Sequence, residues 1–248
     1  MHFKKDIRLF ILNIKNGDYS GLFYLTLKYL YIMTPSALLR SKKTILNCPL
    51  CSYQNQNFLH LSNSIRLSIN SACPNCHSRS RHRGLFFLYK EIISVKKEKK
   101  ILHFAPEIFL QEKIKNFKQH VYHTTDLFMK NVNFREDLLN LSFKDDSYDI
   151  ILNNHVLEHI SNDKKAIQEI HRILKPKGIA IITVPGNWKK KTKHFYSLNN
   201  NGHYRDYGFD FIFKLKKVFK TVNVKNLFKY QGQKHAIKLD EIAFICFK

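Results

Sequence analysis

Two copies of one short cysteine motif restrict this chain more than any other feature of its sequence. Four of the five cysteines form the pairs Cys48/Cys51 and Cys73/Cys76; each pair has a proline after its first cysteine, and 21 residues separate the pairs. Two thiolates three positions apart on a tight turn can reach one tetrahedral ion, and two such turns provide four sulfur ligands. The spacing therefore predicts a zinc ribbon over residues 45–80 with a closed, structural Zn²⁺ site.

Two disulfides or a redox dithiol are the alternatives for these cysteines. The apolar stretches near the start of the chain are interrupted by charged residues, and no uncharged run approaches the ~18–20 residues of a membrane-spanning helix. We therefore expect no signal peptide, no transmembrane helix and a cytoplasmic, reducing location, which favours zinc over disulfides. The fifth cysteine, Cys246, lies in an apolar run and is expected to pack as a small hydrophobe.

The net charge of +23 is distributed unevenly along the 248 residues. Residues 101–186 hold 11 basic and 11 acidic side chains, whereas residues 1–44, 45–100 and 187–248 carry net charges of +6, +7 and +10. Basic flanks suit an anionic partner such as RNA, an anionic glycan or a membrane surface. However, 33 of the 42 basic residues are lysines, and bidentate phosphate binding favours arginine. A compositional bias without function explains the excess equally well.

A basic stretch, residues 77–83, directly follows the last cysteine of the motif. Four thiolates around one Zn²⁺ carry a formal charge of about −2, which nearby basic side chains would balance. Binding of an anionic substrate is the other interpretation of this stretch, and the sequence leaves both open.

Hydrophobic periodicity divides the rest of the chain into three parts. Residues 1–44 have the apolar spacing of two amphipathic helices, which we expect to pack on the protein itself rather than on a membrane surface. A further helix is expected over 83–94. We therefore predict N-terminal helices over 1–44, the ribbon over 45–80 and a larger domain over 81–248.

Strands and helices alternate in the larger domain. Buried strands are predicted at 101–105, 121–125, 148–153 and 178–184, and helices at 108–117 and 163–174. Such alternation is typical of a parallel, doubly wound α/β sheet. After a helix at 209–219, strands at 222–228 and 241–247 have no helix between them, which predicts an antiparallel closing pair.

Three stretches of this domain carry a resemblance to a known family. Residues 137–151 (DLLNLSFKDDSYDII), 154–160 (NHVLEHI) and 172–178 (RILKPKG) resemble segments of the class I methyltransferases that depend on S-adenosyl-L-methionine (SAM). The resemblance implies a Rossmann-like, seven-stranded, mostly parallel sheet with an antiparallel last strand, and SAM as cofactor. The cysteine motif and residues 101–107 and 202–208 also resemble a bacterial subgroup with an N-terminal zinc ribbon, several members of which belong with surface-polysaccharide biosynthesis.

The resemblance also implies a set of cofactor-binding residues. In place of the family's glycine-rich first loop, an acid followed by G-x-G-x-G, this chain has His103, Ala105 and Glu107 within the sequence HFAPE, so the close backbone approach that glycines allow is partly lost. Ala105 remains small, and Glu107 is expected near the charged end of the cofactor. Asn154, after the fourth strand, completes this group.

Acidic residues farther along are expected to bind the nucleoside of the cofactor. Asp126, followed by Leu127, ends the second strand, where one carboxylate can accept hydrogen bonds from both ribose hydroxyls; capping of a turn is the alternative. Asp137, followed by Leu138, aligns with the family position that contacts adenine, and a plain surface carboxylate is its alternative.

Few groups are required for catalysis, because methyl transfer from a sulfonium is an in-line displacement that depends mainly on alignment. His155 lies where family members face the transferring methyl group and is the candidate general base. Glu158 and His159 are expected to have local structural roles. Candidates for substrate binding are His203, Tyr204 and Arg205, together with a basic rim that contains the aromatic residues Trp188, Phe195, Tyr196, Tyr204 and Tyr207.

The sequence thus predicts a SAM-dependent methyltransferase that acts on a hydroxyl of a sugar, a glycan or a related small-molecule intermediate, with an anionic acceptor favoured. An RNA methyltransferase is the first alternative, since a zinc ribbon and a positive charge both suit RNA. The altered first loop leaves a second alternative, a non-catalytic scaffold that holds a partner.

Overall fold

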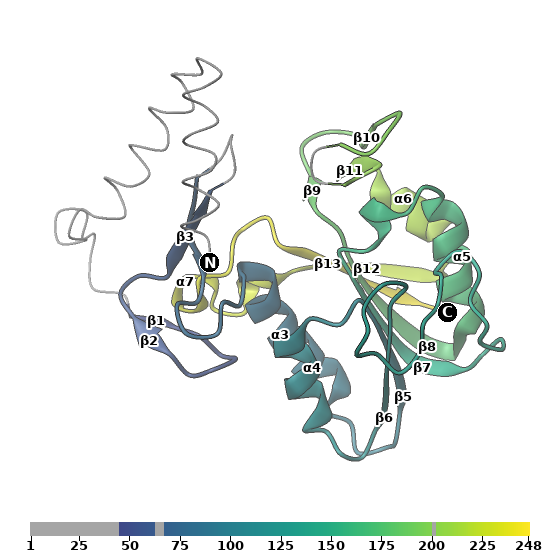
Figure 1. Cartoon of the computed structure of the whole chain (residues 1–248), viewed down its shortest axis with the longest axis horizontal. Helices are drawn as coiled ribbons and strands as arrows, with labels where there is room; N and C mark the ends of the chain where they lie inside the picture. Colours follow the sequence, from purple (N-terminus) through teal and green to yellow (C-terminus); the bar gives the residue numbers. More distant parts are fainter. Residues whose placement is uncertain (1–44, 63–66, 200–201) are drawn as a thin grey trace.

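The computed structural model describes residues 45–62, 67–199 and 202–248 (Figure 1). The two N-terminal helices expected over 1–44 lie outside the described residues. Within the described ranges, no helix combines the length and the apolar character needed to cross a membrane.

A six-stranded sheet forms the centre of the described structure, with strand order β12-β13-β8-β7-β5-β6. Its strands are β5 (Lys100–Phe104), β6 (Val121–Thr125), β7 (Tyr148–Asn154), β8 (Leu174–Thr183), β12 (Thr221–Asn226) and β13 (Ile242–Phe247). The strands β6, β5, β7 and β8 are parallel, β13 is antiparallel to β8, and β12 is antiparallel to β13. The predicted α/β fold and its antiparallel closing pair are confirmed.

The expected count of seven strands is corrected to six in the described part of the chain. Where the seventh strand would pair with β6, there is one parallel bridge, between Thr125 and Phe134. The intervening residues 127–131 are all exposed. Because they bury no alternating face, they lack the packing that holds a strand at the edge of a sheet.

Helices cover both faces of the sheet (Figure 1). One face contacts α3 (Ser80–Ile93) and α4 (Ile108–Lys115), and the other contacts α5 (Asp163–Ile173) and α6 (Phe211–Lys216). In α5, residues 166, 167, 170 and 173 are buried, which is the spacing of an amphipathic helix on a sheet. The two apolar layers fix the position of the carboxyl ends of the parallel strands.

The segment between β12 and β13 differs from its prediction. Instead of a direct connection, it contains a 3₁₀ turn, η2 (Leu227–Lys229), and a one-turn helix, α7 (Gly232–His235). The residues on either side of α7, Gln231 and Ala236, both have left-handed backbone conformations. Such a short element has little helical periodicity, so the sequence pattern did not reveal it. The segment contacts the ribbon, because Nδ1 of His235 lies 2.8 Å from the carbonyl oxygen of Asn47.

The ribbon consists of two antiparallel hairpins. These pair β1 (Leu46–Asn47) with β2 (Gln54–Asn55), and β3 (Leu59–Ser62) with β4 (Leu67–Ala72). Buried side chains of the ribbon, Leu46 and Phe58, belong to the same apolar cluster as Leu85 and Leu88 of α3. The ribbon therefore shares a hydrophobic core with the larger domain.

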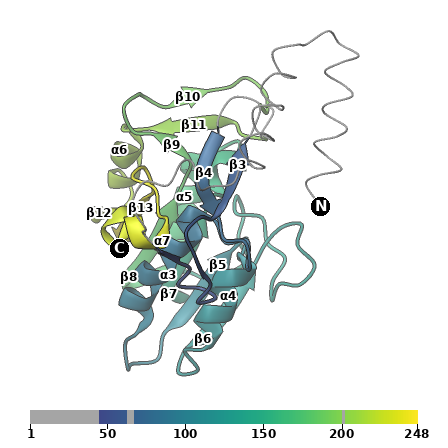
Figure 2. The same ribbon diagram turned by 90° about the vertical axis from the view of Figure 1, so that its left-hand side faces the viewer.

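A small three-stranded sheet, the fourth in the described residues, lies at one end of the central sheet (Figures 1 and 2). It has strand order β10-β11-β9 and consists of β9 (Gly186–Asn187), β10 (Lys193–His194) and β11 (Arg205–Gly208). Because β9 begins three residues after β8 ends, this sheet stands at the carboxyl edge of the parallel strands. A short 3₁₀ helix, η1 (Leu157–His159), follows β7 at the same edge.

Candidate functional site

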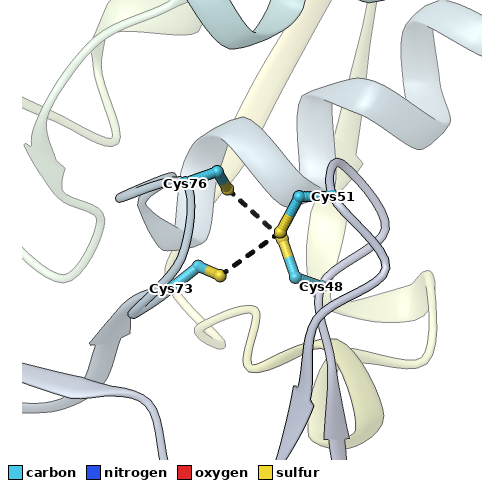
Figure 3. Close-up of side chains that lie close together, drawn as sticks. All are labelled: Cys48, Cys51, Cys73 and Cys76. Atoms are coloured by element: carbon cyan, nitrogen blue, oxygen red, sulfur yellow. Dashed lines mark hydrogen bonds between the residues drawn. The ribbon is translucent and has the colours of Figure 1, made fainter.

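The four motif cysteines converge at one point between the hairpins (Figure 3). Sγ of Cys48 lies 3.7 Å from Sγ of Cys76, and Sγ of Cys51 lies 3.6 Å from Sγ of Cys73. None of the four is in a disulfide. The two turns have the same backbone pattern: the N–H of Ser52 donates to the carbonyl of Cys48, and that of His77 donates to the carbonyl of Cys73.

This cluster fits a tetrahedral metal ion. With Zn–S distances of about 2.3 Å, a Zn²⁺ ion would hold its four sulfurs about 3.8 Å apart, close to the two Sγ–Sγ separations above. Ser52 and His77, which follow the second cysteine of each pair, both have a left-handed backbone that turns the chain around the site. The geometry and the donor chemistry suggest a four-thiolate zinc site, which remains a proposal.

The predicted cofactor residues lie around the point where the strand order reverses. From β5, the chain continues to β6 on one side and then crosses to β7 on the other, and α/β folds bind ligands at the carboxyl edge of such a switch point. Ala105, directly after β5, has φ +45°, and its N–H donates to the carbonyl of Thr125. The loop thus keeps a left-handed position of the kind glycine favours, although alanine occupies it.

A buried polar network connects three of the predicted residues, His103, Glu107 and Asn154. The Asn154 side-chain amide donates to Oε2 of Glu107 over 3.1 Å, and Nε2 of His103 lies 3.2 Å from the same oxygen. The Tyr89 hydroxyl donates to Oδ1 of Asn154, and the Tyr122 hydroxyl lies 2.8 Å from Nδ1 of His103. The network holds the Glu107 carboxylate at the mouth of the first loop.

The charge states in this network follow from its geometry. Burial alone would raise the pKa of Glu107, but the hydrogen bond and positive charge of His103 outweigh it and lower the pKa to about 2. Burial lowers the pKa of His82, whose Nε2 lies 3.8 Å from Oε1 of Glu107, to about 3. Glu107 is therefore ionised and paired with His103, and the neighbouring His82 imidazole is neutral.

Several buried polar atoms near this edge have no hydrogen-bond partner among the described residues. They are Oε1 of Glu107, Nε2 of His82, Oγ1 of Thr125 and both side-chain amide atoms of Asn153. Buried polar atoms are nearly always paired in proteins, so a group of unpaired ones indicates a ligand or water site. The polar amino-acid end of SAM has the donors and acceptors to pair with them, so the residues present fit that cofactor.

Asp126 is placed at the carboxyl end of β6, as predicted, and Oδ1 has a local role. It accepts hydrogen bonds from the N–H groups of Phe128 and Met129, both at 2.7 Å. Oδ1 therefore has the alternative, turn-capping role. The second oxygen, Oδ2, would be the one to accept hydrogen bonds from a ribose diol. Leu127 is exposed beside it.

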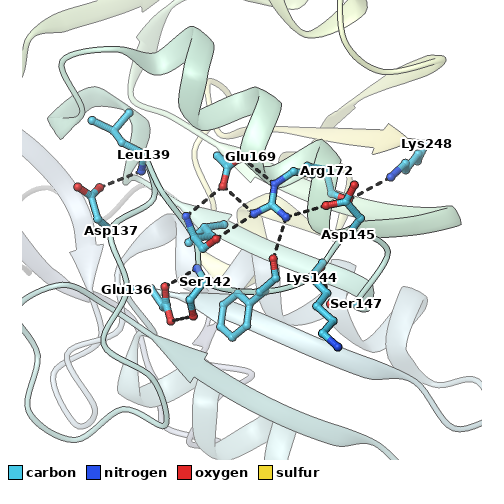
Figure 4. Close-up of polar contacts among 12 residues, drawn as sticks. Glu136, Asp137, Leu139, Ser142, Lys144, Asp145, Ser147, Glu169, Arg172 and Lys248 are labelled. Carbon is cyan, nitrogen blue, oxygen red and sulfur yellow. Dashed lines mark hydrogen bonds and ion pairs between the residues drawn. The ribbon is translucent and has the colours of Figure 1, made fainter.

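Asp137 lies in a loop that the partly exposed Arg172 holds in place (Figure 4). Oδ1 of Asp137 accepts the N–H of Leu139, and the next residue after Asp137, Leu138, is 4% exposed and packs in the core. Arg172 binds Glu169 and donates to the carbonyls of Leu141 and Phe143. Arg172, the first residue of the family-like segment 172–178, therefore has a structural role. It holds the loop that contains Asp137, the residue expected to contact adenine.

His155 directly follows β7 and has φ +52°. It is a second left-handed position at the carboxyl edge of β5 and β7, which we call the mouth of the site. Its N–H donates to the carbonyl of Thr183, and its Nδ1 lies 3.3 Å from Oε1 of Glu158. Glu158 is 1% exposed on its side chain, whereas His155 is 22% exposed. The pair has the geometry of an imidazole oriented by a buried carboxylate.

Arg205 and Tyr207 are corrected from substrate-binding candidates to structural residues. Arg205 is 3% exposed and donates to the backbone carbonyls of residues 157, 160 and 161. The buried Tyr207 hydroxyl donates to Asp163. The sequence pattern did not place these two residues against η1 and the start of α5. Trp188, another residue of the predicted rim, is half-buried, and its ring packs on Phe244.

Tyr89, Tyr122 and His82 belong to the site but had no predicted role. His82 and Tyr89 are seven residues apart on α3, a spacing that puts both on one helix face. This seven-residue spacing is the sequence signal that could have placed His82 and Tyr89 together. The helix predicted over 83–94 left His82 outside, and nothing in the sequence indicated that Glu107 lay opposite this face.

Comparisons with known proteins concern the family and the fold. The sequence profile of a family described as a methyltransferase domain matches residues 109–182. An uncharacterized protein of Methanocaldococcus jannaschii is 50% identical over 48 residues, which cover 19% of this chain and 21% of that protein. The match thus spans about a fifth of the relative's length.

Solved structures resemble the larger domain. A 1,6-didemethyltoxoflavin-N1-methyltransferase of Burkholderia thailandensis, solved with S-adenosylhomocysteine, aligns with a TM-score of 0.52 at 14% identity over 68% of this chain and 78% of that chain. A SAM-dependent methyltransferase of Archaeoglobus fulgidus aligns with a TM-score of 0.49 at 15% identity over 68% and 94% of the two chains. The first likeness shows a shared fold.

Proposed function

We propose that this chain, whose residues 109–182 match a methyltransferase domain, transfers the methyl group of SAM to a hydroxyl of a sugar, a glycan or a related small-molecule intermediate. The observation that carries the proposal is the mouth of the site, where the buried Glu107 carboxylate and the His155–Glu158 pair stand at the carboxyl edge of neighbouring strands. The Glu107 carboxylate would bind the cofactor, and the His155–Glu158 pair would act on the acceptor.

SAM supplies an electrophilic methyl group on a sulfonium. The negative Glu107 would bind the ammonium end of the cofactor, and Oδ2 of Asp126 would accept from the ribose. Asp137 and the backbone of Leu138 would meet the adenine. Ala105 is small enough to let the backbone of the loop approach the cofactor.

A hydroxyl acceptor requires the removal of a proton as the new O–C bond forms. We assign this step to His155, whose Nε2 would take the hydroxyl proton while Glu158 holds Nδ1 and stabilises the resulting imidazolium. Glu158 is the positioning residue of the pair. A neutral amine or thiolate acceptor would need this arrangement less, so the pair supports a hydroxyl.

The surface beside the mouth supports an anionic acceptor. Exposed lysines follow β9 at positions 189, 190, 191 and 193, and the Lys193 ammonium lies 5.2 Å from the centre of the Phe195 ring. The exposed Tyr196 adds an aromatic face. Positive charge with aromatic rings suits a sugar that carries a phosphate or a nucleoside diphosphate.

Calorimetric binding of S-adenosylhomocysteine tests the cofactor site. We expect binding by the zinc-loaded protein, its loss in Asp126→Ala, and its retention in the exposed control Asp240→Ala. A ligand concentration of 100 times the Kd should stabilise the wild type by about 2.7 kcal/mol. If neither SAM nor S-adenosylhomocysteine binds the wild type, the scaffold alternative replaces this proposal.

Transfer of labelled methyl groups to nucleotide sugars tests the acceptor. His155→Asn is the suitable variant, because asparagine tolerates a left-handed backbone. We expect kcat to fall by about 10²–10⁴ while binding of S-adenosylhomocysteine is unchanged. An unchanged kcat would remove His155 from the mechanism.

RNA is a second candidate acceptor, favoured by the net charge of +23 and by the exposed lysines at the mouth. Binding through several phosphates should weaken by about 10³-fold or more between 50 and 200 mM salt. Absence of ribosomal RNA binding at low salt would eliminate this candidate.

A further inference from the structure

A second group of metal-ligating side chains lies at the mouth, separate from the cysteine cluster. Glu158 and His159 are the last residues of η1, and His203 lies two residues before β11. The candidate ligand atoms of these three side chains all lie within 4.8 Å of one another. We propose that Glu158, His159 and His203 bind a first-row divalent transition-metal ion such as Zn²⁺.

The donor set selects the class of ion. Two imidazole nitrogens and one carboxylate oxygen suit zinc, cobalt and their neighbours, whereas magnesium and calcium prefer oxygen ligands throughout. Three protein ligands leave the fourth position of a tetrahedral ion open. The His159 side chain is 47% exposed, so this open position faces the mouth rather than the core.

Both histidines are oriented as metal ligands usually are. Nδ1 of His159 lies 2.8 Å from the carbonyl oxygen of Gly202, and Nδ1 of His203 lies 3.3 Å from Oδ1 of Asp206. With Nδ1 donating its hydrogen, Nε2 of each ring keeps a lone pair for coordination. A backbone carbonyl and a carboxylate are the partners that typically fix ligating histidines from behind.

Glu158 has the charge that a cation would balance. Its side chain is 1% exposed, and Oε2 has no hydrogen-bond partner among the described residues. Oε1 lies 3.3 Å from Nδ1 of His155 and 3.9 Å from Nε2 of His159. Burial of a carboxylate with an unpaired oxygen is costly, and coordination of a divalent ion would compensate for it.

The two segments that carry the ligands are fixed against each other. The Arg205 guanidinium donates to the carbonyls of Leu157 and Ile160 over 3.0 and 2.7 Å, which ties β11 to η1. The N–H of Tyr204 donates to the carbonyl of Glu158 over 2.8 Å. Sites held by such supporting contacts bind metals with little rearrangement.

The location suggests what the ion would do. Glu158 also contacts Nδ1 of His155, so an ion bound by Glu158 would fix the carboxylate that orients the candidate base. This consequence rests on the proposed methyl transfer, whereas metal binding itself does not.

Metal content of the full-length protein tests the site. After zinc loading and gel filtration, we expect about two zinc ions per chain in the wild type and about one in the double variant His159→Gln/His203→Gln. The matched control is His194→Gln, an exposed histidine in β10, which should keep both ions. Equal zinc content in the wild type and the double variant would overturn the proposal.

A substitution behind one of the ligands distinguishes a preorganised metal site from nonspecific binding by surface histidines. Asp206→Asn should weaken binding of Co²⁺ to the second site by about 10–100-fold in a spectroscopic titration, because it removes the carboxylate behind His203. Asp240→Asn, at an exposed position, should leave the titration unchanged. Equal Co²⁺ affinities in the wild type and Asp206→Asn would also contradict the assignment. Binding of S-adenosylhomocysteine, measured in the same proteins, reports on the proposed function separately.

Discussion

Single residues at the mouth of the site adopt backbone conformations that their side chains disfavour. Ala105 and His155 have φ values of +45° and +52°, and they begin the loops after two neighbouring strands, β5 and β7. A left-handed conformation costs a residue with a side chain about 1–2 kcal/mol, and such costs collect where function requires the geometry. Strain at both loops supports the assignment of this edge as the functional site.

The substitution Ala105→Gly tests this strain. Glycine adopts the left-handed conformation freely, so we expect the free energy of unfolding to rise by about 0.5–1 kcal/mol despite the greater flexibility of the unfolded chain. Ala166→Gly, inside α5, should instead lower it by about 1 kcal/mol. Urea unfolding of the three proteins is the measurement, and a loss of stability in Ala105→Gly would show that Ala105 is not strained.

His82 is expected to make stability depend on pH. Its pKa is about 6.5 in the unfolded chain but is lowered by burial to about 3 in the folded protein, so its contribution is complete above pH 6.5 and is lost progressively as pH falls toward 3. The slope in this window is at most about 1.4 kcal/mol per pH unit.

A comparison with His82→Asn isolates this contribution. Unfolding free energies measured between pH 7 and pH 5 should fall less steeply in the variant, and acid effects on the cysteine site cancel because both proteins share them. Parallel curves would mean that His82 titrates normally in the folded protein.

At the residue scale, the sequence correctly predicted positions at the ends of strands. Asp126 and Asn154 are at strand ends, as expected. It failed for Arg205, because an arginine in a polar stretch gives no sign that its guanidinium will be buried among backbone carbonyls of a segment 44–48 positions away.

At the scale of elements, the ribbon and the larger domain are joined by one buried arginine. Arg83 of α3 is fully buried and donates to the carbonyls of Ser78, His235 and Ala236 at 2.7 Å or less. It therefore links the second cysteine turn to α7. Its charge also interacts with Cys48, Cys73 and Cys76, which supports the charge-balance interpretation of the basic stretch 77–83.

The substitution Arg83→Lys measures this link. Lysine keeps the charge but cannot reach all three carbonyls, and each hydrogen bond from a charged group contributes about 1.5–3 kcal/mol. We expect a loss of about 3 kcal/mol in denaturant unfolding and faster release of zinc to a chromogenic chelator. Arg79→Lys, at an exposed position, should behave as the wild type; equal behaviour of the two variants would exclude the link.

Most elements were predictable because their apolar residues recur with a clear helical or strand period. Strands β5, β6 and β7 and helices α4 and α5 lie within one or two residues of their expected bounds. The 3₁₀ turns, α7 and the three-stranded sheet at the mouth were not predicted, since elements of two to four residues contain no full period and depend on tertiary contacts.

At the scale of the whole molecule, the shared core predicts how loss of zinc would spread. Leu46 and Phe58 of the ribbon pack in one cluster with Leu85, and His235 contacts Asn47, so the ribbon and α7 should open together. The parallel strands β5, β7 and β8 share this cluster on one face, but a second apolar cluster on the other face and their ladder of backbone pairs should keep them closed.

Hydrogen exchange of Cys76→Ser tests this expectation and leaves the proposed second metal site intact. A structural zinc contributes about 10 kcal/mol or more to folding in small peptides, so protection in the ribbon and in 232–237 should fall by at least about 100-fold. Protection in β7 should not change. Uniform loss across the sheet would show instead that the whole chain depends on the cysteine site.

The contacts of Arg83 also bear on how the chain folds during synthesis. The carbonyl of His235 that it requires lies 152 positions farther along the sequence. At the usual 5–20 residues per second, the ribosome needs roughly 8–30 s to reach that partner. Throughout this interval the cysteine turns have emerged without α7 to cover them, so their thiols are open to metal capture and to oxidation. In a chain that binds zinc at this site as proposed, correct folding would therefore depend on zinc supply at the ribosome.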